Sequence, residues 1–77
     1  MSTGRMSIAL NNYLQSKDML PSLRWEESSS GLAHAPVWTS ICKIDDEVIS
    51  TGTGSHKNIA RDVAAEEALR ILRSRDT

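Results

Sequence analysis

Apolar side chains near the N-terminus recur at the spacing of an α-helix. Four of them fall at positions i, i+4, i+7 and i+8 and therefore share one helical face: Met6, Leu10, Tyr13 and Leu14. The pattern predicts a helix from Met6 to Lys17, with Thr3 or Ser7 as its N-cap. Asp18 and Pro21 end this helix, because the residues around a proline leave the helical region.

The middle of the chain is rich in β-forming residues and turn signals. Apolar and charged residues alternate over Ser22–Glu27, which predicts a half-buried strand, and a loop follows at Ser28–Gly31. Two further strands are predicted at Val37–Ile44 and Glu47–Thr51, joined by a tight turn at Asp45–Asp46. The three consecutive strands would form an antiparallel meander.

The last third of the chain predicts a second helix. The segment Gly52–Ser55 is expected to break the third strand, and Ser55 is a suitable N-cap. The apolar stripe of this helix consists mainly of small residues: Ala60, Ala64, Ala68, Ile71 and Leu72, widened by Val63, Ala65 and Leu69. The order predicts an α+β fold, a two-layer sandwich with a three-stranded antiparallel sheet and two helices packed on one face.

Composition narrows the class of protein. A length of 77 residues allows one small domain with a single core. The net charge of −1 does not indicate a nucleic-acid binder, so such an activity would depend on the local placement of basic residues. Cys42 is the only cysteine, which excludes an intrachain disulfide and a zinc site of the usual kind. We therefore expect a chain of the cytoplasm or nucleus, with no cofactor, no metal and no membrane-spanning segment.

The start of the second helix carries the most informative charges. Lys57 and Arg61 are four residues apart and share one face, although the helix dipole disfavours cations at this end. An anionic partner would explain the placement, and a solvated helix face is the alternative. The preceding Gly52-Thr53-Gly54 lacks the length of a nucleotide-binding loop, so a strand-to-helix turn is the simpler interpretation.

The remaining polar and aromatic residues give no sign of catalysis. His34 and His56 lie in predicted loops without a nucleophile and an acid at a recognisable spacing, so we expect no enzymatic activity. Trp25 and Trp38 occupy strand positions and are interpreted as core aromatics rather than as base-stacking platforms. The acidic run at Asp45–Glu47 is interpreted as a solvated turn and not as a metal site.

A series of short motifs runs along most of the chain. They are Leu10-Asn11-Asn12-Tyr13, Gln15, Pro21, Gly31-Leu32-Ala33-His34-Ala35-Pro36-Val37-Trp38, Gly52-Thr53-Gly54-Ser55-His56-Lys57-Asn58-Ile59-Ala60-Arg61, Ala64-Ala65, Ala68-Leu69 and Leu72. Their order and spacing resemble the double-stranded RNA-binding domain family from about Ser7 to Leu72. We expect a short lead at residues 1–6, this domain at residues 7–73 and a C-terminal tail at residues 74–77.

The resemblance implies three regions of RNA contact. Asn12 on the first helix would lie in one minor groove, and His34 would enter the next minor groove from the loop after the first strand. The start of the second helix would hold the phosphates between them, through His56, Lys57, Asn58 and Arg61. A-form RNA exposes its 2′-hydroxyls in a wide minor groove, so such a domain would recognise duplex shape and exclude DNA.

Several positions depart from the family pattern and favour weaker binding than is usual. Asn12 stands where the family often has Glu, and Ile8 where a polar residue is common. Asn58 removes one of three basic residues, and His56 replaces a frequent Ser. The first hypothesis is a non-catalytic double-stranded RNA-binding module, accessory to RNA silencing or processing. The alternative is a protein-interaction module of the same fold, which dimerises or docks on a partner through the strand Glu47–Thr51.

Overall fold

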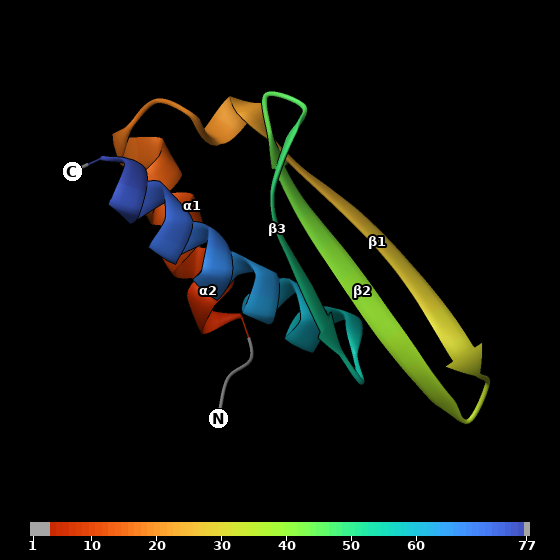
Figure 1. The fold of residues 1–77 in the computed structure, drawn as a ribbon. Helices are drawn as coiled ribbons and strands as arrows, with labels where there is room; N and C mark the ends of the chain where they lie inside the picture. The colour runs from red at the N-terminus through yellow and green to blue at the C-terminus, as the bar shows by residue number, and fades with distance from the viewer. Residues whose placement is uncertain (1–3, 77) are drawn as a thin grey trace.

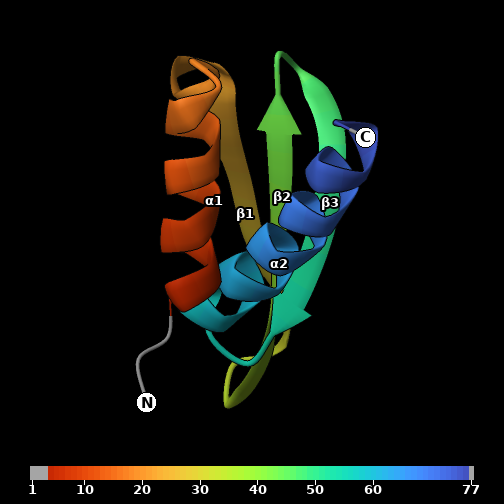
Figure 2. The same ribbon diagram turned by 90° about the vertical axis from the view of Figure 1, so that its left-hand side faces the viewer.

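The computed structural model describes residues 4–76 and confirms the predicted two-layer architecture. The elements in chain order are α1 (Arg5–Ser16), a short 3-10 helix η1 (Leu20–Ser22), β1 (Leu23–Leu32), β2 (Ala35–Ile44), β3 (Glu47–Gly54) and α2 (Lys57–Arg75). The sheet is antiparallel in the order β1-β2-β3, and both helices lie on the same face of it (Figures 1 and 2).

The first hairpin is longer than the sequence pattern predicted. The segment Ser28–Gly31, which we expected to be a loop, belongs to β1 and pairs in register with residues 36–39 of β2. Only Ala33 and His34 remain as the turn between the two strands. Serine and glycine composition suggested a loop, but the pairing partner across the sheet determines the conformation of this segment.

The third strand also extends further than expected, because its glycines serve helix packing. Gly52 and Gly54 lie within β3 rather than in a break before α2. A Cβ atom on Gly52 would collide with the carbonyl oxygen of Ala60 and the backbone nitrogen of Ala64. A Cβ atom on Gly54 would lie 2.6 Å from the side chain of Ile59. The two glycines therefore let α2 approach the strand closely.

The hydrophobic core lies between the sheet and the two helices. Its buried members come from both helices, β2 and β3: Leu10, Leu14, Cys42, Ile44, Ile49, Ala65, Ala68, Leu69 and Leu72. Met6, Tyr13 and Ile71 pack against this core and are partly buried, as the helical pattern predicted. Val63 was expected on the same stripe, but it is 46% exposed and lies outside the core.

The start of α1 is stabilised by a residue from the other helix. The N-cap position is Gly4, which offers no side chain, and Ser7 lies inside the helix instead of capping it. Thr3, the other predicted cap, lies outside the described residues. The Oδ1 atom of Asp62 on α2 accepts the backbone N–H groups of Met6 at 2.8 Å and of Ser7 at 3.1 Å. Asp62 thus supplies the cap and joins the first turn of α1 to α2.

The second helix differs from the prediction at both ends. His56, not Ser55, is its N-cap, and no side chain closes the cap with a hydrogen bond. The helix continues to Arg75, into the part that we expected to be a tail. Near this end, the Tyr13 hydroxyl donates a hydrogen bond to Asp76, and Lys17 forms an ion pair with the same carboxylate at 3.2 Å. The C-terminal ends of the two helices are therefore joined as well.

The close packing of α2 on β3 predicts a large effect of substituting Gly52→Ala. The new Cβ would meet backbone atoms, which cannot rotate away as a side chain can. We expect the free energy of unfolding to fall by about 3 kcal/mol or more in urea titrations. Thr53→Ala is the matched control, because Thr53 is an exposed neighbour in the same strand, and it should cost less than about 1 kcal/mol. Equal stability of Gly52→Ala and the wild type would contradict the close packing.

Candidate nucleic-acid interface

The α2 start, which we define as residues His56 to Arg61, exposes the first turn of the helix. The side chains of His56, Lys57 and Asn58 are all exposed. The first turn contains no acidic residue. Backbone N–H groups at a helix N-terminus lack intrahelical partners and carry a partial positive charge. Together with Lys57, these groups form a surface suited to an anion such as a phosphate.

Arg61 lies at the α2 start, but its guanidinium is turned towards the sheet. Its Nε and Nη2 atoms donate hydrogen bonds to the two carboxylate oxygens of Glu27 on β1, each at 2.7 Å. The guanidinium carbon lies 5.2 Å from the centre of the Trp25 ring, within the range of a cation–π contact. The basic residue that the family resemblance assigned to phosphate binding is therefore also an ion-pair partner within the domain.

Lys57 lies above the second tryptophan. Its ammonium nitrogen is 5.9 Å from the centre of the Trp38 ring. We expected both tryptophans to be core aromatics. Trp25 packs against the core as predicted, whereas Trp38 is partly buried and supports Lys57. The two cations of the α2 start, Lys57 and Arg61, therefore each lie within cation–π distance of an indole ring of the sheet.

Glu27 is a charged residue of this surface that the sequence analysis did not single out. The hydrogen-bonded Arg61 guanidinium holds the pKa of the Glu27 carboxyl below its usual value of 4.5, and the charge of Lys57 acts in the same direction. The hydroxyl of Ser40 donates a further, longer hydrogen bond at 3.3 Å. The carboxylate thus offsets one of the two positive charges at the α2 start. The alternation along β1 placed Glu27 on the helix-facing side with Trp25, which was the available signal.

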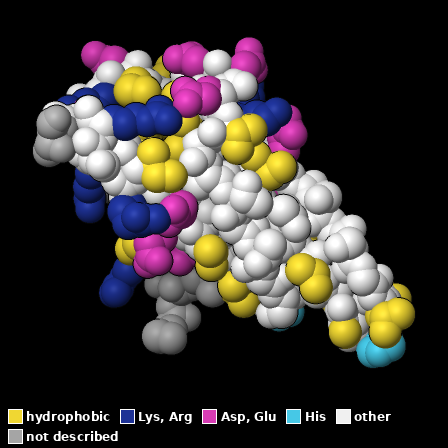
Figure 3. Space-filling view, viewed as in Figure 1, with side chains coloured by type: hydrophobic (Ala, Val, Ile, Leu, Met, Phe, Trp, Pro, Cys, Tyr) yellow, Lys and Arg dark blue, Asp and Glu magenta, His cyan; other side chains and the backbone are white. Residues whose placement is uncertain are grey.

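His34 occupies the turn of the β1–β2 hairpin and is exposed there. The hairpin projects beyond the start of α2 (Figure 1). No Lys, Arg, Asp or Glu occurs in the sequence from Ser28 to Cys42, and Figure 3 shows this arm without charged side chains on the face in view, with histidine at its end. An uncharged, narrow arm can approach a polyanion without repulsion and without strong attraction.

Asn12 lies on the exposed side of α1. Ile8, one turn earlier, is 63% exposed on the same helical face. Arg5, seven residues before Asn12, is also exposed on that face and is the first residue of the helix. Arg5, Ile8 and Asn12 have the spacing i, i+3, i+7 of one helical face. This spacing could have identified Arg5 as a third basic residue near the predicted RNA-binding residues, in addition to Lys57 and Arg61.

The fold brings two of the three predicted contact regions to one end of the domain, together with the first turn of α1. The hairpin turn with His34, the α2 start and the first turn of α1 lie at the same end in both ribbon views (Figures 1 and 2). The hydrogen bonds that the backbone N–H groups of the first turn of α1 donate to Asp62 fix the relation between the two helices. At a rise of 1.5 Å per residue, Asn12 lies about 10 Å along α1 from Arg5. Asn12 is therefore further from this end than the hairpin turn and the α2 start are.

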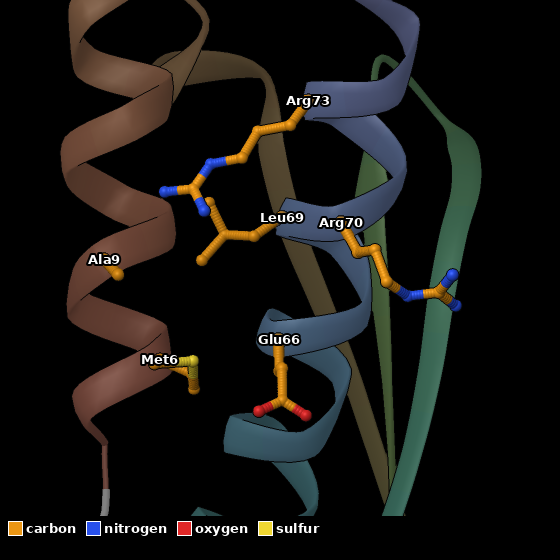
Figure 4. A pocket seen from close by; sticks show the side chains of 6 residues that line it. All are labelled: Met6, Ala9, Glu66, Leu69, Arg70 and Arg73. Carbon is orange, nitrogen blue, oxygen red and sulfur yellow. The ribbon is translucent and has the colours of Figure 1, made fainter.

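A separate pocket of about 350 Å³ lies between the two helices. It is lined by Met6, Ala9, Glu66, Leu69, Arg70 and Arg73, and contains none of the predicted RNA-binding residues. Leu69 and Arg73 extend towards α1, whereas Arg70 points away from it (Figure 4). Both signs of charge border the pocket, so its electrostatics do not select one kind of ligand.

Other kinds of site find little support in the described residues 4–76. No three metal-ligating side chains gather in one place within this range. Burial raises the pKa of the Cys42 thiol to about 11, so the thiol stays protonated at neutral pH and is a poor nucleophile. Neither helix in this part of the chain is long and apolar enough to cross a membrane.

Comparison with known proteins identifies the family. The model of the double-stranded RNA binding motif matches residues 8–72, so the chain belongs to this family. Among solved structures, the domain is similar to a solution structure of both dsRBDs of DRB4 with their linker. The sequences are 26% identical, and the TM-score is 0.68. The match covers 95% of this chain and 50% of that one, so the chain spans half the length of that structure. No curated protein matches the sequence.

The Glu27–Arg61 pair predicts a specific dependence of stability on pH. The folded-state pKa of Glu27 lies below 4.5, so its contribution to stability is present above that value and is lost as the pH falls through the folded-state pKa. We expect the urea midpoint of the wild type to fall between pH 5 and pH 3, and that of Glu27→Gln to fall less steeply.

Glu26→Gln is the control, because it removes a neighbouring, more exposed carboxylate that pairs with Lys43. A direct NMR titration of the Glu27 side-chain carboxyl carbon gives a second measurement. Titration of Glu27 at or above 4.5 would show that the ion pair does not persist in solution.

Proposed function

We propose that this domain binds double-stranded RNA without catalysing a reaction, and that it recognises the A-form duplex through minor-groove 2′-hydroxyls and phosphates. The observation that carries the proposal is the placement of the hairpin turn and the α2 start at one end of the domain (Figures 1 and 2). A domain that contacts two minor grooves and the phosphates between them spans about 16 base pairs. Family membership and the similarity to the dsRBDs of DRB4 support the same class of ligand.

Each region has a distinct chemical role in this proposal. Lys57 and the free backbone N–H groups of the first turn of α2 bind phosphate oxygens. The amide side chain of Asn58 and the ring of His56 add hydrogen bonds at the same place. His34 reaches a minor groove from the hairpin turn, where its ring can donate to or accept from a 2′-hydroxyl.

Helix α1 provides the second minor-groove contact. The amide of Asn12 can donate and accept hydrogen bonds, so it can replace a carboxylate towards a 2′-hydroxyl. Arg5 adds a positive charge at the end of α1 nearest to the α2 start. This charge partly replaces the basic residue that Asn58 removes, and the sequence pattern had not drawn attention to it.

A protein partner is the second candidate function. Strand β3 is an edge of the sheet, and Val48 on this strand is 54% exposed. An edge strand offers unpaired backbone groups to another strand. Binding of RNA and binding of a protein at β3 would use different parts of the domain, so the two functions are separable by experiment.

The proposal predicts a preference for RNA and a defined role for Lys57. A duplex RNA of about 20 base pairs should bind more tightly than the DNA duplex of the same sequence, because only RNA has 2′-hydroxyls. Lys57→Ala should weaken binding to unrelated RNA duplexes about equally. It should also reduce the slope of log K against log salt by about 0.9, the value for one lost phosphate contact.

Lys43→Ala is the matched control, because it removes the same charge from β2, where Lys43 pairs with Glu26. This control should change neither the affinity nor the salt slope measurably. Equal affinity for RNA and DNA would contradict recognition through 2′-hydroxyls. No binding of duplex RNA, together with concentration-dependent association in light scattering, would favour the protein-interaction function instead.

A further inference from the structure

The contact between Glu27 and Arg61 joins the sheet directly to the α2 start. Both carboxylate oxygens accept hydrogen bonds, one from Nε and one from Nη2, at 2.7 Å each. This parallel arrangement is the geometry with which a guanidinium also binds a phosphate. The edge of Arg61 best suited to an RNA phosphate is therefore already occupied by a carboxylate of the same chain.

Glu27 is held in place by the sheet rather than by the helix. It lies in β1 directly opposite Ser40 of β2, and the Ser40 hydroxyl hydrogen-bonds to its carboxylate at 3.3 Å. The Glu27 side chain is 14% exposed, whereas that of Arg61 is 38% exposed. A carboxylate with so little access to water depends on its cation, because removal of the partner would leave a poorly solvated charge.

Trp25 adds a second restraint on the guanidinium. The centre of the ring lies 5.2 Å from the guanidinium carbon, and Trp25 also packs against the core. Arg61 is therefore held by an ion pair and a cation–π contact at once. An incoming phosphate has to displace Glu27 or to share Arg61 through its remaining Nη1 donors, and in either case the attraction is reduced by the neighbouring negative charge.

We propose that Glu27 is a specificity-determining residue that limits the phosphate affinity of the domain by pairing with Arg61. The inference rests on the proposed function and adds that the Glu27 carboxylate competes with RNA phosphates for Arg61. Because phosphates are common to RNA and DNA, Glu27 lowers the affinity for both. The contacts to 2′-hydroxyls do not involve Arg61, so they account for a larger share of the remaining affinity. Glu27 thus makes binding depend more on duplex shape and less on charge.

The decisive substitution is Glu27→Gln, which keeps the size of the side chain and its hydrogen bond with Ser40 but removes the charge. We expect binding of an RNA duplex of about 20 base pairs to tighten about fivefold near 0.15 M salt, and the salt slope to steepen by about 0.9. Binding of the matching DNA duplex should tighten by at least the same factor, so the preference for RNA should not increase. Circular dichroism and a thermal melt confirm that each variant is folded.

Two further variants separate the roles of the residues. Glu26→Gln removes a neighbouring carboxylate that pairs with Lys43, and it should leave RNA affinity unchanged. Arg61→Ala in the wild type would leave the poorly exposed Glu27 carboxylate without its cation, so the substitution is made in the Glu27→Gln background, where no unpaired anion remains. There it should weaken RNA binding several-fold, because Arg61 is free to bind phosphate when Glu27 carries no charge. An increase in affinity from Glu27→Gln that persists in the absence of Arg61 would assign the effect to Lys57 and overturn the proposed pairing.

The outcomes distinguish this inference from the proposed function. If the wild type binds duplex RNA but Glu27→Gln binds equally or more weakly, Glu27 positions Arg61 for the phosphate and the inference is wrong, while the function stands. If neither the wild type nor Glu27→Gln binds duplex RNA, the proposed function itself is wrong. Should Glu27→Gln be unstable, Arg61→Lys serves as a second test. It keeps the charge and breaks the bidentate geometry, so its salt slope should be steeper than that of the wild type.

Discussion

Helix α2 packs so closely on β3 that no Cβ atom fits between Gly52 and the backbone of the helix. The Ser50 hydroxyl strengthens this contact with a buried 2.6 Å hydrogen bond to the carbonyl oxygen of Ala64. Ala60 and Ala64 are completely buried, so neither helix nor sheet can shift without overlap or a cavity. This contact fixes where α2 begins relative to the sheet. The position of Lys57 over Trp38 and of Arg61 over Trp25 follows from it.

In the proposed function, the same rigid placement lets a domain with a net charge of −1 present a local site for a polyanion. The first turn of α2 supplies unpaired N–H groups, and the hairpin arm that extends past it carries no charge to repel phosphates. Asp62 connects α1 to this arrangement through the two backbone hydrogen bonds at its first turn. Glu27 lowers the charge of the surface without altering its shape. In the proposed function, this lower charge makes binding depend more on duplex geometry than on electrostatic attraction alone.

Much of this fold could be predicted from the periodicity of apolar residues, because helix α1, the strand order and the small-residue stripe of α2 are local patterns. The segment Ser28–Gly31 was assigned to a loop because of its serine and glycine composition, which does not show that it pairs with residues 36–39 of β2. Gly52 and Gly54 suggested a break in the third strand, because the local sequence does not show that α2 packs against them. The candidate site residues were named from motifs and remain predictions. The Glu27–Arg61 pair joins positions 34 residues apart and required the three-dimensional structure.

The central claim is that the surface formed by the hairpin turn, the α2 start and the exposed face of α1 contacts duplex RNA. Amide NMR spectra recorded during titration with an RNA duplex of about 16 base pairs test this most directly. The account predicts the largest shifts at His34, at residues 56–58 and along α1 from Arg5 to Asn12. It predicts small shifts at Leu69 and Arg73 in the pocket between the helices. The largest shifts at β3 around Val48, or in that pocket, would contradict the account.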